Sequence, residues 1–342
     1  MRILCKLLQK DWSWGLGVDE LINALPEYEF IKILIGRQSD DFDIILAQNL
    51  VALKNISHKN LHKTICRLGS NRQFDDKENR KELNLVHAVI ATNKRLYEIG
   101  KTFNDNVYLI PNGLDLTKWQ PVQKTKQFTV GFAGNVKGFQ YGDYKGFSLV
   151  KEACGKINTE LKTALYKDNQ IPYSEMRDKF YSQISCLVLP TLGEGNSNVI
   201  MESLSCGVPV LTTKEAGFHG EKLTDGVNCL FITRDAKDIA TKIERLRDSH
   251  RLRESIALNG REFAKDNHDI KKIACEYKKL FDECYLNATG KQAEMQHDTD
   301  TLVNVRFLQN AMEEDLNHIL SGTIKKISLY RAKQLGDIVE IL

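Results

Sequence analysis

Two glutamates with seven residues between them, Glu194 and Glu202, are the side chains of this sequence best suited to chemistry. The apolar run Ser185–Thr191 before them is typical of a buried parallel strand, which Pro190 closes. Glu194 is then expected on a loop at the carboxyl end of a strand, where open α/β sheets bind ligands. Glu202 is expected roughly 8 Å into the following helix, whose N-terminus attracts anions. The arrangement indicates two carboxylates that flank a phosphate pocket and grip the hydroxyls of a sugar nucleotide. The alternative is a surface loop glutamate followed by an exposed helix glutamate.

A second candidate binding loop follows the strand predicted at Phe128–Ala133 and carries Lys137 and Lys145. A helix is expected to begin near Gly146. Its first backbone N–H groups and the two ammonium groups predict a diphosphate site. The loop matches neither the Walker A nor the Gly-x-Gly-x-x-Gly pattern, which argues against ATP and NAD. A surface loop with incidental lysines is the alternative.

Gly15 and Gly17 are expected on a loop between the first strand and a helix over Val18–Leu25. Glycine there lets the backbone approach a ligand closely, although a tight turn explains the pair equally well. Asp41 and Asp43 have the spacing of a manganese-binding Asp-x-Asp, but they precede a strand and so face the wrong end of the sheet.

The histidines show no metal-ligand spacing, so neither a metal nor another cofactor is expected. His219 lies near predicted strand ends and is weighed as a site residue, with a structural role favoured.

Composition indicates an ordinary globular protein long enough for two domains, with 342 residues, 42% apolar and 27% charged. The net charge of +3 is too small to indicate nucleic acid. A basic cluster over Lys54–Arg67 fits an anionic membrane, an acidic acceptor or, preferably, a solvated helix face and loop. Eight scattered cysteines predict buried free thiols and a reduced compartment. Without a signal peptide or a long apolar run, we expect a cytoplasmic protein with at most peripheral contact at the inner membrane face.

Alternating strand-like and helix-like segments predict two Rossmann-like α/β domains with parallel sheets. We expect an N-terminal domain at 1–118, a C-terminal domain at 119–287, and a polar linker with a helical tail at 288–342. A helix is also expected over Lys77–Leu85, and the helix Asp269–Asn287 is expected to pack back across the junction. In the tail, apolar residues at helical spacing indicate an amphipathic helix that packs on the body or forms an oligomer. These residues are Leu316, Ile319, Leu320, Ile324 and Ile327.

Several stretches, in order, make the chain resemble a family 4 glycosyltransferase with the two-domain GT-B fold. They are GLG near the start, IPNGLD (110–115), VGFAGN (130–135), YKGFSLVKEA (144–153), the run from IPYSEM to VPVLTT (171–213), and TDGVNCLFI (224–232). The resemblance covers about residues 1–285. It implies a metal-independent, retaining transfer from a nucleoside-diphosphate sugar, UDP- or GDP-linked, bound to the C-terminal domain. It also implies that the acceptor binds mainly to the N-terminal domain. The acceptor expected is a saccharide, a lipid-linked saccharide or a protein, and the process expected is polysaccharide biosynthesis.

The same resemblance assigns roles to single residues. Glu194 contacts the sugar hydroxyls, Glu202 holds the ribose, and Lys145 binds the diphosphate. The remaining donor-binding residues that it implies are Gly195, Asn196, Ser197, Asn198, Lys137, Asn135, Gly15 and Gly17.

Two departures from the family pattern stand out. Asn135 occupies the place of a common arginine, so Lys137 is expected to supply that charge without a bidentate fork. A histidine common in the first domain has no counterpart, and RLGS (67–70) lies there instead. A sugar-nucleotide epimerase or hydrolase on this fold, and a non-catalytic sugar-nucleotide-binding subunit with the tail as partner helix, are the alternatives.

Overall fold

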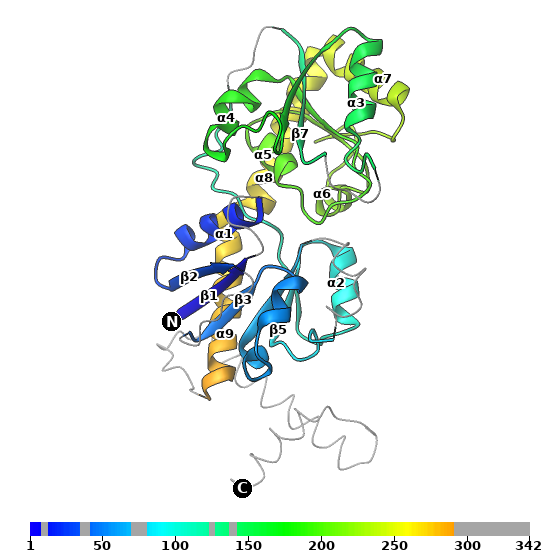
Figure 1. Cartoon of the computed structure of the whole chain (residues 1–342). Helices are drawn as coiled ribbons and strands as arrows, with labels where there is room; N and C mark the ends of the chain where they lie inside the picture. The colour runs from blue at the N-terminus through cyan, green and yellow to red at the C-terminus, as the bar shows by residue number, and fades with distance from the viewer. Residues whose placement is uncertain (8–12, 35–41, 70–80, 123–126, 137–141, 291–342) are drawn as a thin grey trace, which may run out of the picture. The chain divides into compact units, whose positions relative to one another are not determined.

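The computed structural model describes residues 1–7, 13–34, 42–69, 81–122, 127–136 and 142–290. The described residues form two parallel sheets flanked by helices (Figure 1), and Met1–Gly290 constitutes one compact unit. The predicted α/β architecture with two parallel sheets is therefore confirmed. Lys137 and the tail 291–342, with its expected helix, lie outside the described residues.

The first sheet has the strand order β2-β1-β3-β4-β5-β6, with every neighbouring pair parallel. Its inner strands are short apolar runs buried on both faces, such as IILA and AVIA, as expected of a sheet covered by helices. The order reverses between β1 and β3, which makes this edge the topological switch point of the first half. The strands are β1 (Arg2–Leu7), β2 (Glu29–Leu34), β3 (Ile44–Ala47), β4 (Thr64–Leu68), β5 (Ala88–Ala91) and β6 (Val107–Leu109).

The second sheet repeats this plan with the order β11-β10-β9-β7-β8, again parallel throughout. Its switch point lies between β7 and β9, so the loops that follow these two strands border the crevice where such sheets bind ligands. The strands are β7 (Thr129–Gly134), β8 (Glu160–Leu165), β9 (Cys186–Leu189), β10 (Val210–Thr212) and β11 (Leu230–Phe231).

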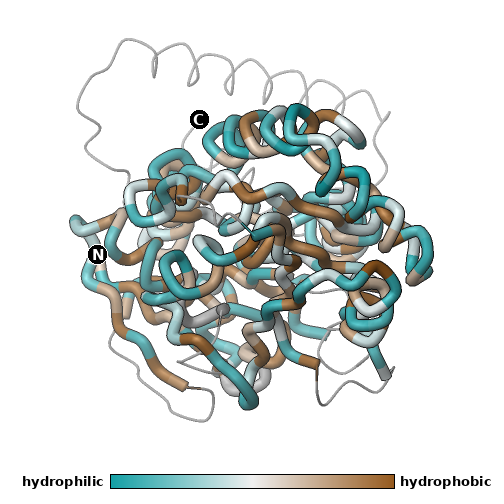
Figure 2. The backbone as a smooth tube through the Cα atoms, turned by 90° about the horizontal axis from the view of Figure 1, so that it is seen from above, coloured by the Kyte–Doolittle hydropathy of each residue, from teal (hydrophilic) through white to brown (hydrophobic). Residues whose placement is uncertain are grey.

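Several helices are amphipathic, and hydrophilic and hydrophobic residues alternate along the backbone tube (Figure 2). Side-chain caps begin several of them: Asp235, Ser249 and Asp269 accept hydrogen bonds from backbone N–H groups of the first turns that follow. The helices are α1 (Ser13–Ala24), α2 (Lys94–Lys101), α3 (Phe147–Lys156), α4 (Met176–Lys179), α5 (Asn198–Ser205), α6 (Phe218–Lys222), α7 (Ala236–Asp248), α8 (His250–His268) and α9 (Ile270–Thr289). Short 3-10 segments cover Leu50–Asn55, His58–Lys63, Tyr173–Glu175 and Tyr181–Gln183.

Helix α9 returns from the second half of the sequence to the first sheet (Figure 1). Its buried residues Ile273, Tyr277 and Phe281 join Ile3 and Ile44 in one hydrophobic cluster. Covering this face of the sheet with α9 agrees with the expectation for Asp269–Asn287 and makes the buried side chains between Ile273 and Cys284 part of the first half's core.

Two local predictions are wrong, and one helix is not among those predicted. Residues 81–85 form turns rather than the end of a helix over Lys77–Leu85. Helix α1 already begins at Ser13, so Gly15 and Gly17 lie in its first turns and not on a loop. Helix α2 was not anticipated; the side chain of Asn93 starts it by accepting a hydrogen bond of 2.8 Å from the Leu96 N–H.

The cysteines are free, and all are buried except Cys275 on α9. Burial raises the pKa of Cys5 and Cys206 to about 12, so these thiols are protonated at neutral pH. The prediction of buried free thiols is thus confirmed for seven of the eight cysteines.

Among the described helices, none has the length and apolar character needed to cross a membrane. Likewise, the described residues hold no group of three or more His, Cys, Asp or Glu side chains placed to bind a metal ion.

Candidate functional site

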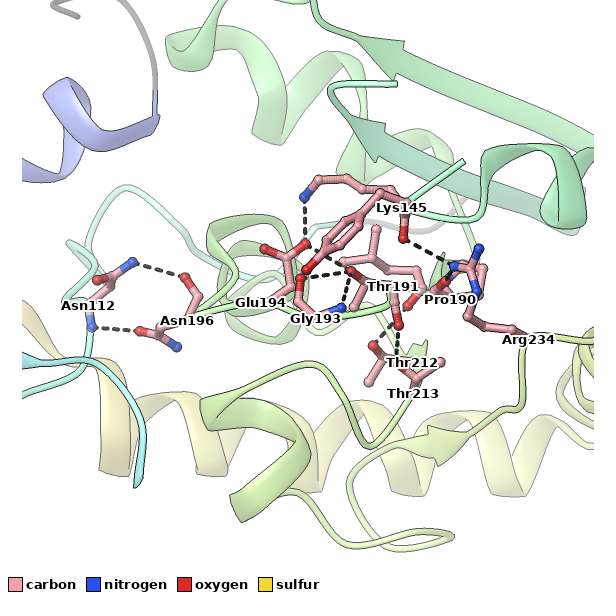
Figure 3. Close-up of polar contacts among 12 residues, drawn as sticks. Asn112, Lys145, Pro190, Thr191, Gly193, Glu194, Asn196, Thr212, Thr213 and Arg234 are labelled. Atoms are coloured by element: carbon pink, nitrogen blue, oxygen red, sulfur yellow. Dashed lines mark hydrogen bonds and ion pairs between the residues drawn. The ribbon is translucent and has the colours of Figure 1, made fainter. Parts of the chain in front are cut away.

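Lys145 and Glu194 meet at the switch point of the second sheet. They come from the two loops that follow β7 and β9, and Lys145 Nζ lies 2.6 Å from Glu194 Oε1 (Figure 3). The Thr191 hydroxyl donates to the same carboxylate oxygen at 3.3 Å. Each of the two charged side chains is 16% exposed, so the pair is shielded yet reachable from solvent. A positive and a negative group thus stand side by side where this topology binds ligands.

Arg234 holds these two loops together. Its guanidinium donates to the carbonyl oxygens of Asp143 at 2.6 Å and Tyr144 at 3.1 Å, and also to that of Pro190 (Figure 3). Directly after the neighbouring strand β10, the Thr213 hydroxyl donates to the Thr191 carbonyl at 2.7 Å. The backbone on both sides of the Lys145–Glu194 pair is therefore fixed by side chains, which preorganises the pair.

Gly195 continues the Glu194 loop and touches the first half of the chain. A Cβ atom at Gly195 would lie 1.9 Å from the Gly69 carbonyl oxygen, so no side chain fits there. The Asn93 amide donates to the Gly195 carbonyl at 2.9 Å and to the Glu194 carbonyl at 3.4 Å. The same asparagine that caps α2 therefore also orients the glutamate loop.

Asn112, between β6 and the second half, makes backbone and side-chain hydrogen bonds to several residues of this site. Its N–H donates to Asn196 Oδ1 at 2.6 Å, and its amide donates to the Asn196 carbonyl at 3.1 Å (Figure 3). The amide also donates to Asn198 Oδ1 at 2.7 Å. In turn, Asn112 Oδ1 accepts a hydrogen bond from Arg67. Two of the predicted donor-binding residues are thus held by one side chain.

Glu202 lies on α5, as predicted, but it is 3% exposed and bonded to a phenol. The Tyr181 hydroxyl donates to its carboxylate at 2.7 Å. Burial raises the pKa of Glu202 to about 7, an effect that the Tyr181 bond opposes and the nearby Glu20 carboxylate reinforces. Glu20 on α1 is itself buried, which raises its pKa, and it accepts hydrogen bonds from the Asp115 N–H and the Tyr173 hydroxyl.

The start of α3 corrects the expected diphosphate site. Gly146 is its N-cap with φ +75°, a conformation that favours glycine. The N–H groups of Phe147 and Ser148, however, donate to the Asp143 carboxylate at 2.7 and 2.8 Å. These first-turn amides are already satisfied by a protein anion, so they do not offer the open phosphate cradle that the sequence indicated.

The positions of Ser197, Asn135 and His219 say less about ligand binding. Ser197 is the N-cap of α5 by position, but its side chain makes no capping bond. Asn135 follows β7 and is half-buried. His219 is fully buried, and its ring packs against His268 with centroids 5.1 Å apart. Burial lowers the pKa of His219 well below its usual range, so a neutral structural histidine is the outcome.

Sequence reasoning missed the residues that brace the site. These are Asn93, Asn112, Thr191, Arg234 and Arg67. Thr191 and Asn112 carried a usable signal. Thr191 ends the apolar run Ser185–Thr191, and Asn112 follows the apolar run 107–110 in the turn Pro111–Asn112–Gly113.

The fold of the chain and part of its sequence are similar to those of known proteins. Two parallel sheets with the same strand plan form the GT-B fold of two-domain glycosyltransferases. Residues 155–249, which include the Glu194 loop and α5, match the family model described as "Glycosyl transferases group 1".

Two curated relatives are similar over part of the chain. The capsular polysaccharide biosynthesis glycosyltransferase CapM of Staphylococcus aureus is 31% identical over 183 residues, which cover 48% of each chain. An uncharacterized glycosyltransferase of Methanocaldococcus jannaschii, MJ1178, is 28% identical over 145 residues, 40% of each. The matched region thus spans less than half the length of these relatives.

Solved structures share the fold over most of both chains. Anabaena HepE in complex with UDP-glucose aligns with a TM-score of 0.66 at 14% identity, over 83% of this chain and 100% of that one. The sucrose-phosphate synthase of Thermosynechococcus elongatus aligns with a TM-score of 0.68 at 14% identity, over 83% and 99%.

Proposed function

We propose that this protein is a glycosyltransferase that moves a sugar from a nucleoside-diphosphate sugar to an acceptor hydroxyl. The observation that carries the proposal is the Lys145–Glu194 pair, placed between two loops at the switch point of a GT-B sheet. The match of residues 155–249 to glycosyl transferases group 1 supports it. The UDP-glucose bound in the structurally similar HepE supports a UDP-linked donor.

The site suggests how the donor is held. Glu194, 16% exposed, accepts hydrogen bonds from hydroxyls of the donor sugar, and the Lys145 ammonium faces the diphosphate. Gly195, Asn196, Ser197 and the start of α5 lie over the phosphates and the sugar. Glu202 exchanges the hydrogen bond from Tyr181 for hydrogen bonds from the ribose hydroxyls.

Reaction without a bound metal and with retention of anomeric configuration is part of the same proposal. As the glycosidic bond to the diphosphate breaks, negative charge grows on the leaving phosphate, where the Lys145 ammonium stabilises it. That phosphate takes the proton of the attacking acceptor hydroxyl on the same face of the sugar. The name of the relative CapM supports a saccharide acceptor in polysaccharide synthesis. A location in the cytoplasm or at the inner face of the membrane is part of the same proposal.

Two measurements test the proposal. In a thermal-shift panel of UDP, GDP, ADP and CDP with their sugars, one nucleotide should raise the melting temperature, since a ligand in excess of its Kd stabilises the folded state. Transfer should fall by about a hundredfold or more in Glu194→Ala. Glu215→Ala serves as the control, because Glu215 is an exposed glutamate whose carbonyl, not its side chain, contacts the Glu194 N–H. No shift with any nucleotide, or equal activity of both variants, would contradict the proposal.

A further inference from the structure

Arg67, at the carboxyl end of β4, is a buried cation without a protein counter-ion among the described residues. It is 8% exposed. Its guanidinium donates to Asn112 Oδ1 and is hydrogen-bonded to the Tyr277 phenol, both neutral partners. A buried charge is costly unless another charge compensates it, and a guanidinium presents about five N–H donors in a planar fork. The two neutral partners accept hydrogen bonds from some of the N–H groups of Arg67, but they do not compensate its positive charge.

Arg67 also lines a pocket. The pocket lies at the carboxyl ends of β3, β4 and β6, and its empty volume of about 540 Å³ includes space open to solvent. Arg67 is the one charged residue among its described lining. Gln48 and Asn198 add amide groups, while Ile270, Ile273 and the Tyr277 ring form an apolar wall on α9. Apolar walls exclude water and strengthen any ionic contact made inside. One forked cation, neutral amides and an apolar wall suit an anionic group attached to a less polar body.

The pocket borders the proposed donor loop without including its charged pair. Asn112 joins the two regions, because its side chain accepts from Arg67 and donates to Asn198. Lys145 and Glu194 are absent from the pocket lining. A ligand here therefore lies on the first half's side of the donor loop.

We infer that this pocket binds an anionic group of the acceptor, a carboxylate or a phosphate, with Arg67 as its principal ligand. That the ligand is an acceptor rests on the proposed glycosyltransferase function, whereas the presence of an anion site rests on Arg67 and its surroundings alone. A uronic acid supplies a carboxylate, and a phosphorylated saccharide or lipid-linked saccharide supplies a phosphate; both offer oxygens that match the guanidinium fork.

A purely structural role for Arg67, as a bridge between Asn112 and Tyr277, predicts different behaviour. Removing a structural bridge lowers stability and leaves ligand binding alone. Removing a charge kept for a ligand leaves the ligand-free protein at least as stable, because an uncompensated buried charge disappears. Stability without ligand and binding of anions therefore separate the two roles.

The experiment measures thermal shifts of the full chain at constant ionic strength, with UDP present to occupy the donor site. The probes are inorganic phosphate, glucuronate and uncharged glucose. Wild type should be stabilised by at least one anion and not by glucose. In Arg67→Gln, the apparent Kd for that anion should rise about tenfold or more. Arg95→Gln, which changes an exposed arginine on α2, should bind as wild type does.

Each result decides the matter. A shift with glucuronate points to a uronic acid, and one with phosphate alone points to a phosphorylated acceptor. The inference is overturned if neither anion stabilises the wild type, if Arg67→Gln responds as wild type does, or if Arg95→Gln loses the same response. It is also overturned if Arg67→Gln only melts earlier with its anion affinity unchanged. Should Arg67→Gln not fold, Arg67→Lys keeps the charge without the fork and should still weaken binding.

The same measurements distinguish failure of the donor proposal from failure of the pocket proposal. If no nucleotide shifts the melting temperature while an Arg67-dependent anion shift persists without UDP, the donor proposal fails and the pocket stands. If UDP binds and no anion does, the pocket alone fails.

Discussion

Asn112 and Asn196 are joined by two hydrogen bonds, from the Asn112 N–H to Asn196 Oδ1 at 2.6 Å and from the Asn112 amide to the Asn196 carbonyl at 3.1 Å. The end of the first sheet is thereby tied to the glutamate loop of the second. Because Asn112 also accepts from Arg67, one neutral side chain connects the proposed donor loop to the proposed anion pocket.

Asn112→Ala should test the strength of this connection. The change removes the side-chain bonds to Asn196, Asn198 and Arg67, and we expect the free energy of unfolding to fall by about 2–3 kcal/mol. Urea unfolding measures it. Asn60→Ala, which loses an exposed bond to the Ser57 hydroxyl, should stay within about 0.5 kcal/mol of wild type. Equal effects of the two variants would show that the connection does not stabilise the fold.

Gly195→Ala should disturb the loop through crowding. The added methyl would lie 1.9 Å from the Gly69 carbonyl oxygen, so backbone must move, and about 2–4 kcal/mol of stability should be lost. Gly155→Ala is the matched control, because its methyl meets nothing within 4 Å and α3 should gain up to about 1 kcal/mol. Thermal melting of both variants suffices, and an unchanged Gly195→Ala protein would disprove the close approach.

Glu202 should make stability depend on pH. Burial raises its pKa from the usual 4.5 to about 7, so the folded state favours the protonated carboxyl. The contribution of Glu202 to the free energy of unfolding is greatest below pH 4.5 and is lost as pH rises through 7. The difference between the two pKa values corresponds to about 3 kcal/mol. Urea unfolding at pH 5 and pH 8 should therefore show a larger loss in wild type than in Glu202→Gln. An equal loss of stability in wild type and Glu202→Gln would show that other groups cause the pH dependence.

Binding of UDP should release a proton if the ribose contacts ionised Glu202. With a pKa of about 7 in the free protein, the affinity should rise about tenfold between about pH 6 and pH 8. The phosphate of UDP titrates nearby, so the informative quantity is the difference between wild type and Glu202→Gln in isothermal titration calorimetry. An identical pH dependence in both proteins would argue against the ribose role.

Lys145→Met should weaken UDP binding while leaving the fold intact. The Lys145 side chain is 16% exposed, and its ammonium meets the diphosphate in the proposed site, so the Kd should rise about tenfold or more. Lys151→Met on α3 changes an exposed lysine and should bind UDP as wild type does. Fluorescence or calorimetric titration compares them, and a Kd unchanged in both would remove Lys145 from the diphosphate site.

The ends of the strands could be located from the sequence. The loops that carry Glu194 and Lys145 could be located with them. Buried parallel strands are continuous apolar runs, and side chains that follow two such strands at a switch point must converge. Even the position of Glu202 within its helix followed from the cap and the helical rise.

The bracing contacts could not be predicted, since they join segments far apart in the chain. Arg234 reaches Pro190 and Asp143 through a long side chain whose direction only packing decides. The start of α3 differs from the prediction for a local reason: the Asp143 carboxylate caps it, from four and five residues before the amides that it binds. The sequence places Arg67 in a basic cluster but does not reveal which cation of that cluster is buried.

The exposure of Cys275 provides a practical handle. The other seven thiols are buried, so a maleimide dye at neutral pH should attach to α9 alone, without prior removal of cysteines. Since α9 covers the first sheet and its residues Ile270, Ile273 and Tyr277 line the pocket, the label would report on that wall from its solvent side. Occupation of the pocket could then be followed by fluorescence in the otherwise unaltered chain.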